Sequence, residues 1–459
     1  MFFYYTDGND MDKINEHVER GTWMSPNTGP WFRSTSLPGM NLHIYPTKQF
    51  KTVTLVLMMQ QALTEEAVTP TAMLAQVLKR GSTRYPTIQA MKRYLDNLYG
   101  ASFQVDVDKR GERQVLQFYL DLPHAKYLSG EKDLLEKGVA FLADVLLHPL
   151  VDEQGGFAPR YVEAGKDSLR RQIQGIIDDK IRYAQERCIE EMCQNEPFRL
   201  LPYGRLEDLE TVESKPLFQH YRRVLEQSPI DLFVVGQVQE QDVVSAVQRH
   251  FTFQTRQVKP LSPAGGDPIH VDEVRSVVEE LDVTQGKLNL GLRTGGLTLA
   301  SPEYPALMVY NGLLGGFAHS KLFRNVREKA SLAYYASSRL DSLKGILMIQ
   351  TGIEVSNYQR TLDIVKEQLE MMRQGNFSQL EIEQTKSLLV HHLREVHDRA
   401  GLLVDYAFRG LVAGVRQTPD ELIQRILSVT REEIQQVAER IELDTVYFLR
   451  NRQQEEGAV

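Results

Sequence analysis

The pattern of hydrophobic positions predicts alternating strands and helices in the first half of the chain. In KTVTLVLMM (51–59) every second residue is apolar, which is the period of a β-strand with one buried face. The next apolar stretch, TPTAMLAQVLKRG, has helical spacing. Thr69 suits its N-cap, Pro70 its first helical position and Gly81 the position just past its end. We therefore predict a strand at 51–59, followed by a helix that starts at Pro70.

The same alternation continues to the end of the chain. A second helix, a hairpin around the turn DKRGER, and helices at 131–147 and 157–193 follow, and a helix and a strand (PIDLFVVGQV) close the first half. In the second half a strand precedes two helices, two strands and further helices, one of which opens with the capping box Ser378-x-x-Glu381. A final helix and strand, QQVAERIELDTVYFL, mirror the end of the first half.

The repeated order of elements predicts an α+β fold of two homologous domains, each a mainly antiparallel sheet packed against helices. The two domains are expected at 37–254 and 271–459. Between them, residues 255–270 contain KPLSPAGGDP, a composition typical of an interdomain linker. Residues 1–36 are mixed in character and rich in turn formers, and we interpret them as an N-terminal arm.

Composition narrows the class of protein. The chain has 459 residues, 42% of them hydrophobic and 25% charged, which is the balance of a globular protein and not of a disordered or membrane chain. The net charge of −8 argues against a protein that mainly binds nucleic acid. No apolar run spans a membrane, and the start MFFYYTDGND is acidic where a signal peptide is basic. We expect a cytoplasmic protein whose Cys188 and Cys193 are reduced thiols.

One motif in the second half resembles a known family. The segment NGLLGGFAHSKLFRNVREKASLAY is similar to the pattern LGGG-x-x-S-x-LF-x-x-VREK-x-G-LAY of the insulinase/pitrilysin zinc peptidases, the inverzincins. It departs from that pattern at Phe317, in place of the third glycine, and at Ser331, in place of the glycine before LAY. The resemblance implies a LuxS/insulinase-like metallopeptidase-homologue fold. It also implies that Arg327 and Tyr334 bind substrate, because both side chains can donate hydrogen bonds to a peptide carbonyl.

The same family carries zinc on an H-x-x-E-H helix in its first domain, just before a Gly-Thr or Gly-Ser step. Here the resemblance assigns that step to Gly81 and Ser82, so that the ligand and base positions fall on Ala72, Ala75 and Gln76. The downstream glutamate of the family falls near Gln172. Alanine offers no donor atom, and a carboxamide is a poor zinc ligand beside imidazole. We therefore expect no metal, no cofactor and no catalytic residues.

A second histidine-rich stretch does not replace the lost site. In HHLREVHD, His397 follows His392 at i+5, and five residues of a regular helix rotate the second side chain about 140° away from the first. The two imidazoles cannot share one tetrahedral ion, so we interpret the stretch as a solvated helix face. The sequence also contains no P-loop, G-x-G-x-x-G or G-x-S-x-G motif.

The favoured hypothesis is a catalytically inactive bacterial member of this family that is not active alone. It resembles the zinc-less member of the paired insulinase-like proteins of Bacillus-type bacteria. We expect it to form a heterodimeric peptidase with a paralogue that carries the intact zinc motif, and to contribute Arg327 and Tyr334 to a shared peptide chamber. Two alternatives stay open: a non-proteolytic scaffold or peptide-holding subunit of an assembly, and an autonomous peptidase with an unrecognised site.

Overall fold

The computed structural model describes residues 31–128, 133–265 and 268–452. The predicted N-terminal arm lies outside the described residues as far as residue 30. The first described strand, β1 (Arg33–Leu37), includes residues that the sequence analysis assigned to this arm. It pairs with the next strand around a turn at Gly39, whose φ of 85° suits glycine.

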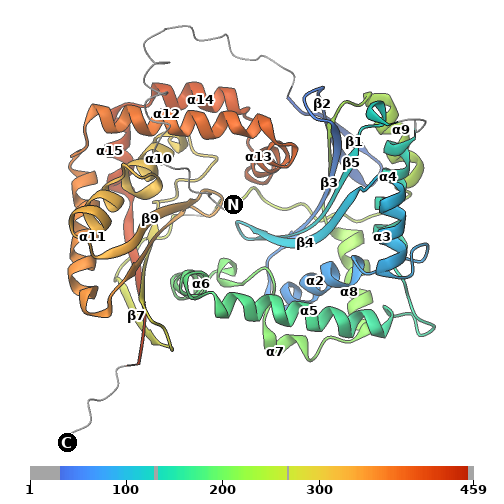
Figure 1. The fold of residues 1–459 in the computed structure, drawn as a ribbon, viewed down its shortest axis with the longest axis horizontal. Coiled ribbons are helices and arrows are strands. Elements are labelled where there is room, and N and C mark those ends of the chain that lie inside the picture. The colour runs from blue at the N-terminus through green and yellow to red at the C-terminus, as the bar shows by residue number, and fades with distance from the viewer. Residues whose placement is uncertain (1–30, 129–132, 266–267, 453–459) are drawn as a thin grey trace, which may run out of the picture. The chain divides into compact units, whose positions relative to one another are not determined.

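Six strands form the first sheet, in the order β1-β2-β6-β3-β5-β4 (Figure 1). Apart from β1, they are β2 (Met40–Pro46), β3 (Thr52–Ala62), β4 (Ser102–Arg110), β5 (Arg113–Pro123) and β6 (Ile230–Gly236). All neighbouring pairs are antiparallel except β2 and β6, which are parallel. The hairpin predicted around DKRGER is the pair β4 and β5.

Five strands form the second sheet, in the order β7-β11-β8-β10-β9. They are β7 (Arg275–Glu280), β8 (Gly286–Arg293), β9 (Ala333–Asp341), β10 (Ile346–Ile353) and β11 (Glu442–Arg450). Only β7 and β11 are parallel. The order and directions therefore repeat those of β2-β6-β3-β5-β4, and the predicted α+β fold of two homologous domains is confirmed. The first half here means the chain up to the linker, and the second half the chain after it.

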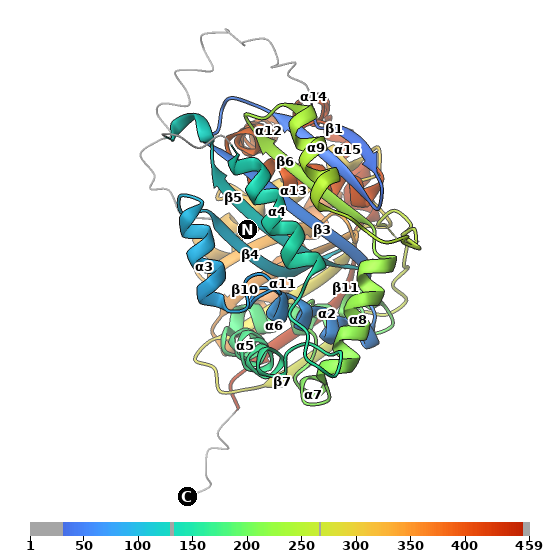
Figure 2. The same ribbon diagram turned by 90° about the vertical axis from the view of Figure 1, so that its right-hand side faces the viewer.

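The helices of the first half are α2 (Glu65–Leu78), α3 (Ile88–Asn97), α4 (Leu134–Leu147), α5 (Pro159–Asp178), α6 (Lys180–Met192), α7 (Leu206–Leu209), α8 (Ser214–Gln227) and α9 (Glu240–His250). Figure 2 shows α3, α4 and α9 over one face of the first sheet. The single helix predicted at 157–193 is wrong, because Asp179 ends α5 and its side chain caps α6 by accepting from the Ile181 and Arg182 amides.

The second half has helices α10 (Tyr304–Asn311), α11 (Tyr358–Arg373), α12 (Gln379–Glu395), α13 (Ala400–Ala413), α14 (Pro419–Ser428) and α15 (Arg431–Arg440). Two π-helical segments, Gly312–Gly316 and Phe323–Lys329, follow α10. The predicted capping box at Ser378 and Glu381 is present at the start of α12.

One helix of each half packs against the sheet of the other half. Helix α13 packs against β3 and β6, and α6 packs against β8 and β11. The prediction of one buried face for β3 is therefore wrong, because Val56 and Met58 on its other face pack with Phe408 of α13. After α6, the Glu196 carboxylate accepts from Arg293 of β8 at 2.6 Å. These contacts tie the two halves together through exchanged elements.

Candidate functional site

Helix α2, which carries the predicted zinc positions, begins earlier than the sequence indicated. Its N-cap is Thr64, whose side chain accepts from the Ala67 amide at 3.3 Å, and Glu65 in the first turn suits the positive end of the helix dipole. The prediction of Thr69 as N-cap is wrong, and Pro70 lies inside the helix. Thr69 instead makes a tertiary contact, accepting from the Arg205 amide at 3.2 Å.

Gly81 also has a different role from the predicted one. The helix ends at Leu78, with Lys79 as the C-cap in ordinary right-handed geometry. A Cβ atom at Gly81 would lie 2.8 Å from the backbone oxygen of Tyr85 and 2.9 Å from the hydroxyl of Tyr161. Glycine is required here because the chain packs closely after the helix and not because the helix needs a left-handed cap.

The structure brings two of the four predicted positions into direct contact. The Gln76 Nε2 group on α2 donates to Gln172 Oε1 on α5 at 3.0 Å, although the residues are 96 apart in sequence. The two helices approach closely at Gly165, where a Cβ would lie 3.4 Å from Gln76 Cβ. The geometry thus joins α2 and α5 through a neutral amide pair.

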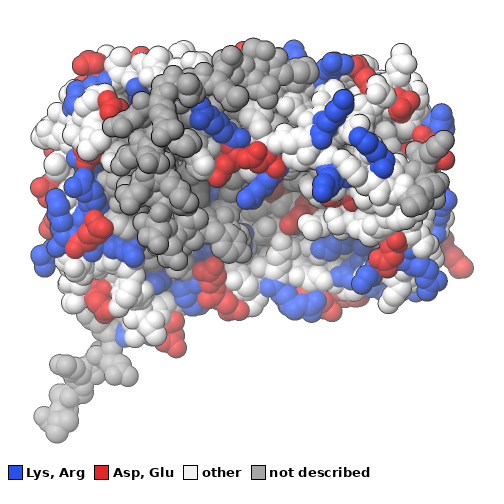
Figure 3. Space-filling view, turned by 45° about the horizontal axis from the view of Figure 1, so that its top comes forward, with Lys and Arg blue, Asp and Glu red and all other residues white. Residues whose placement is uncertain are grey.

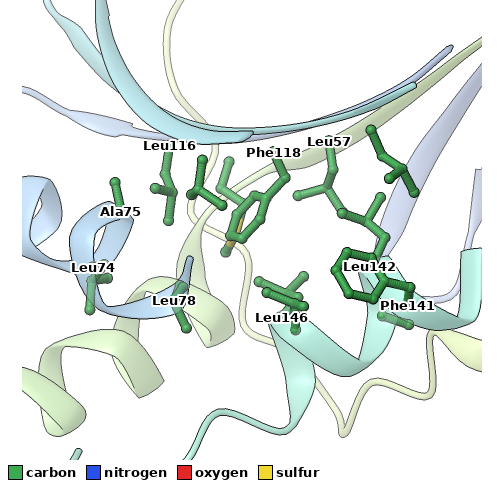
Figure 4. Packing of buried hydrophobic residues seen from close by; sticks show 14 of the residues in the cluster. Leu57, Leu74, Ala75, Leu78, Leu116, Phe118, Phe141, Leu142 and Leu146 are labelled. Carbon is green, nitrogen blue, oxygen red and sulfur yellow. The ribbon is translucent and has the colours of Figure 1, made fainter. Parts of the chain in front are cut away.

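The two alanines are part of the packed core. Ala72 and Ala75 are both 0% exposed. In Figure 4, Ala75 on α2 faces the strands that carry Leu116 and Phe118, and all three residues belong to one hydrophobic cluster. Large apolar side chains surround the methyl group of Ala75. A catalytic carboxylate at this position would instead need water and a metal ion beside it.

These residues do not fit a zinc ion. Zinc sites in proteins use imidazole, thiolate or carboxylate donors in a tetrahedral arrangement, and the four positions offer two methyl groups and two carboxamides. Gln172 Oε1 already accepts a hydrogen bond, while Gln76 Oε1 is buried without a hydrogen-bond partner. Within residues 31–128, 133–265 and 268–452, no group of three or more His, Cys, Asp or Glu side chains is arranged to hold a metal.

One histidine beside α2 was missed by the sequence analysis. His220 of α8 lies 2.8 Å, through Nε2, from the hydroxyl of Thr71 on α2. Burial, with a smaller effect of the nearby Arg223 charge, lowers the pKa of His220 from 6.5 to about 4. The imidazole is therefore neutral at physiological pH. No motif surrounds His220 in the sequence, so only the packing of α8 on α2 reveals this contact.

The predicted substrate-binding residues lie in the second half, at the irregular segment after α10. Arg327 belongs to the π-helical segment Phe323–Lys329, and its guanidinium carbon lies 4.6 Å from the ring centroid of Phe323. Ser331 then takes a φ of 53°, a left-handed conformation that is uncommon for a residue with a side chain. Tyr334 follows at the start of β9, an edge strand, and is 65% exposed.

A glycine fixes the path of this segment. A Cβ at Gly315 would lie 2.4 Å from the backbone nitrogen of Ser338 on β9. The π-helical turn Gly312–Gly316 can pack on the strand only because this side chain is absent. Phe317, which replaces the third glycine of the family pattern, stacks on His319 with ring centroids 5.8 Å apart and contacts the ring of His392 at 5.6 Å.

The histidine-rich stretch HHLREVHD does not lie on a single helix. Helix α12 ends at Glu395, so His397 lies in a separate 3₁₀ turn beyond the helix that carries His392.

Figure 3 shows Lys and Arg side chains interspersed with Asp and Glu on one face of the molecule. In the part of the chain that the structure describes, no helix combines the length and the apolar character needed to cross a membrane.

Comparison with known proteins reveals clear relatives. The profile of the domain family described as "Peptidase M16 inactive domain" matches residues 212–389. Over 415 residues the chain is 41% identical to the "Probable inactive metalloprotease YmfF" of Bacillus subtilis, which covers 90% of this chain and 96% of that protein. The crystal structure of a conserved protein from Enterococcus faecalis has a TM-score of 0.87 at 31% identity, over 93% of this chain and 100% of the other. A Helicobacter pylori protease shares the fold, with a TM-score of 0.76 at 16% identity over 92% and 99% of the two chains.

Proposed function

Because this chain belongs to the M16 peptidase family, the family of insulinase and pitrilysin, we propose that it is a catalytically inactive homologue that acts as the zinc-less subunit of a two-chain peptidase. The observation that carries the proposal is the chemistry of α2. Where a peptidase needs ligands and a base, this chain has two core methyl groups and the amide pair of Gln76 with Gln172.

The second half supports a role in binding peptide. Tyr334 is exposed at the start of an edge strand, so its hydroxyl is free to donate to a ligand outside the sheet. Arg327, on the preceding segment, supplies a permanent positive charge with planar donors. Such donors stabilise the negative charge that develops on a carbonyl oxygen during peptide hydrolysis. In our proposal the two residues hold the peptide while the zinc of the partner chain performs the chemistry.

The proposed partner subunit is a paralogue with an intact H-x-x-E-H helix, and the two chains enclose the peptide in a shared chamber. We place the pair in the cytoplasm. Cys188 and Cys193 are both buried free thiols, which is the state expected in a reducing compartment.

Mixing experiments test this proposal. Each chain is purified alone, and peptide cleavage is measured for the single chains and for the mixture. We expect cleavage only with the paralogue present and a large increase when this chain is added. Arg327→Ala should lower the activity of the mixture at least about tenfold, since a hydrogen bond to a charged group contributes about 1.5–3 kcal/mol.

Arg324→Ala is the matched control, because Arg324 lies in the same π-helical segment and its guanidinium pairs with the Glu381 carboxylate at 3.4 Å. We expect this variant to keep full activity in the mixture. If Arg327→Ala and Arg324→Ala behave alike, the shared-site role of Arg327 is wrong. If the paralogue gains nothing from this chain, a scaffold role without proteolysis is favoured.

A further inference from the structure

A polar relay crosses β1, β2 and β6, at the opposite end of the first sheet from the strands that α2 contacts. Ser34 of β1 and His43 of β2 are directly opposed in the antiparallel register. The hydroxyl of Ser34 lies 2.8 Å from His43 Nδ1, and His43 Nε2 lies 3.1 Å from Oδ1 of Asp231 on β6. A hydroxyl, an imidazole and a carboxylate are thus connected in a row across three strands.

The surroundings of Asp231 determine how this relay is protonated. Its side chain is 1% exposed and also accepts from Asn41 Nδ2 at 3.1 Å and from Gln60 Nε2 at 2.9 Å. Both carboxylate oxygens of Asp231 thus act as acceptors for side-chain N–H groups. His43 therefore directs its Nε2–H toward Asp231, and in the neutral ring Nδ1 is left as the acceptor for the Ser34 hydroxyl. This is the arrangement in which a base activates a serine nucleophile.

The relay opens into a cavity of about 230 Å³ that Ser34 and His43 both line. Trp31, Phe233 and Tyr406 contribute aromatic walls to this cavity. Ser34 itself is exposed, so a ligand in the cavity can reach its hydroxyl. The cavity thus combines aromatic walls with a hydroxyl group at its surface.

Two further side chains that line the cavity can donate hydrogen bonds to a bound substrate. Arg416 and Gln417 line the same cavity, and a guanidinium and a carboxamide both carry N–H groups that can donate to a developing oxyanion. The site therefore contains a nucleophile, a base, a group that orients the base, and candidate oxyanion donors, which together match the requirements of acyl transfer.

We propose that Ser34, His43 and Asp231 form an acyl-transfer site that hydrolyses small esters with apolar acyl groups. The Ser34 oxygen bonds to the ester carbonyl carbon while its proton passes to His43 Nδ1, and Asp231 stabilises the resulting imidazolium. The bond to the leaving alcohol then breaks, and the alcohol takes that proton. Water next gives a proton to His43 and its oxygen to the acyl carbon. The bond between Ser34 and the acyl carbon then breaks, the Ser34 oxygen takes the proton from His43, and a carboxylic acid is released.

The experiment is labelling of the full-length chain with a fluorophosphonate probe, which forms a covalent bond with activated serines, followed by peptide mapping. We expect modification at Ser34 and none in Ser34→Ala. Ser36→Ala is the matched control and should leave labelling unchanged, because Ser36 lies on the same strand but bonds to Asn41 at 3.1 Å and not to an imidazole. His43→Gln should slow labelling at least about 100-fold, the usual contribution of a general base.

Two other measurements keep the proposal testable if His43→Gln does not fold. Unfolding the native chain in urea should abolish the preference for Ser34, and an excess of p-nitrophenyl butyrate should protect Ser34 and be hydrolysed with no effect of a chelator. The proposal is overturned if Ser34 stays unmodified in the folded chain. It is also overturned if folded His43→Gln reacts as fast as the native chain, or if Ser36 is labelled as readily as Ser34.

Discussion

The segment after the central strand differs sharply between the two halves, although the sheets have the same strand order. In the first half, β3 is followed by the regular helix α2, which is buried on most of its surface and linked to α5 by a neutral amide pair. In the second half, β8 is followed by α10 and two π-helical segments that lead to Arg327 and the exposed Tyr334. The segment after β3 is part of the packed core, whereas the segment after β8 has charged and exposed side chains and an irregular backbone.

The shared strand order shows that the scaffold does not depend on which side chains follow its central strand. Small apolar side chains at Ala72 and Ala75 join the core, so the helix is stabilised by packing and needs no metal. The two irregular turns also bury apolar side chains, Leu314 and Val326 among them, but their backbone departs from regular helix geometry, and Ser331 is left-handed. Features of this kind are often found at functional sites, which favours a binding role for the second region.

The largest expected effect comes from rebuilding the zinc ligands in the first region. The triple variant Ala72→His, Gln76→His and Gln172→Glu places two imidazoles at i and i+4 and a carboxylate opposite them. We expect it to bind about one zinc ion per chain with micromolar affinity or better, because these are the donors that zinc prefers. Ala72→His alone is the control and should bind none. A folded triple variant that takes up no zinc would show that the positions were assigned wrongly.

A smaller effect concerns the histidine that supports α2. His220 titrates near 4 in the folded protein and near 6.5 in the unfolded chain, so the unfolded state binds the proton first as the pH falls. The folded state should therefore lose about 3 kcal/mol of stability from this group between pH 7 and pH 4. His220→Gln keeps an acceptor for Thr71 but does not titrate, and its unfolding free energy should fall less by that amount. Urea unfolding of both proteins at the two pH values measures the difference.

Two glycine substitutions compare the packing of the two regions directly. Gly315→Ala should destabilise the protein by about 2 kcal/mol, since the new Cβ would meet the Ser338 backbone at 2.4 Å. Gly165→Ala on α5 should change stability by less than about 1 kcal/mol, because its closest neighbour is the flexible end of Met73 at 3.2 Å and the helix gains from alanine. Thermal unfolding of the two variants tests the order, and equal losses would contradict the packing described for Gly315.

The smallest effect on stability is expected at Tyr334. Because the side chain is 65% exposed, Tyr334→Phe should change the unfolding free energy by less than about 0.5 kcal/mol. In the mixture with the zinc-bearing paralogue, the same change should reduce peptide cleavage clearly, since the lost hydroxyl is the proposed donor. Stability that falls together with activity would mean that the residue has a structural and not a binding role.

Local patterns predicted much of this structure. The alternation of apolar residues identified β3 and the hairpin of β4 and β5, because burial on a sheet imposes a period of two. In the second half β8, β9, β10 and β11 were predicted, but β7 was not. The start of α2 was predicted wrongly because Thr64 and Thr69 are both acceptable caps. Thr64 caps the helix, and Thr69 instead accepts from the Arg205 amide.

Long-range contacts explain what the sequence could not reveal. The exchange of α6 and α13 between the halves brings together elements that are far apart in sequence, and no local pattern encodes it. The relay of Ser34, His43 and Asp231 was missed for the same reason, since His43 and Asp231 are 188 residues apart. At the predicted zinc positions, by contrast, the resemblance to the family brought Gln76 and Gln172 together before any contact was known. Their interpretation as former ligand positions stays a prediction.

Metal analysis of the purified native chain, equilibrated with zinc and then dialysed, decides whether the first half binds a catalytic metal. We expect far less than one zinc ion per chain and no peptide cleavage, both before and after exposure to the metal. One tightly bound zinc ion per chain, with peptide cleavage that a chelator abolishes, would contradict this expectation.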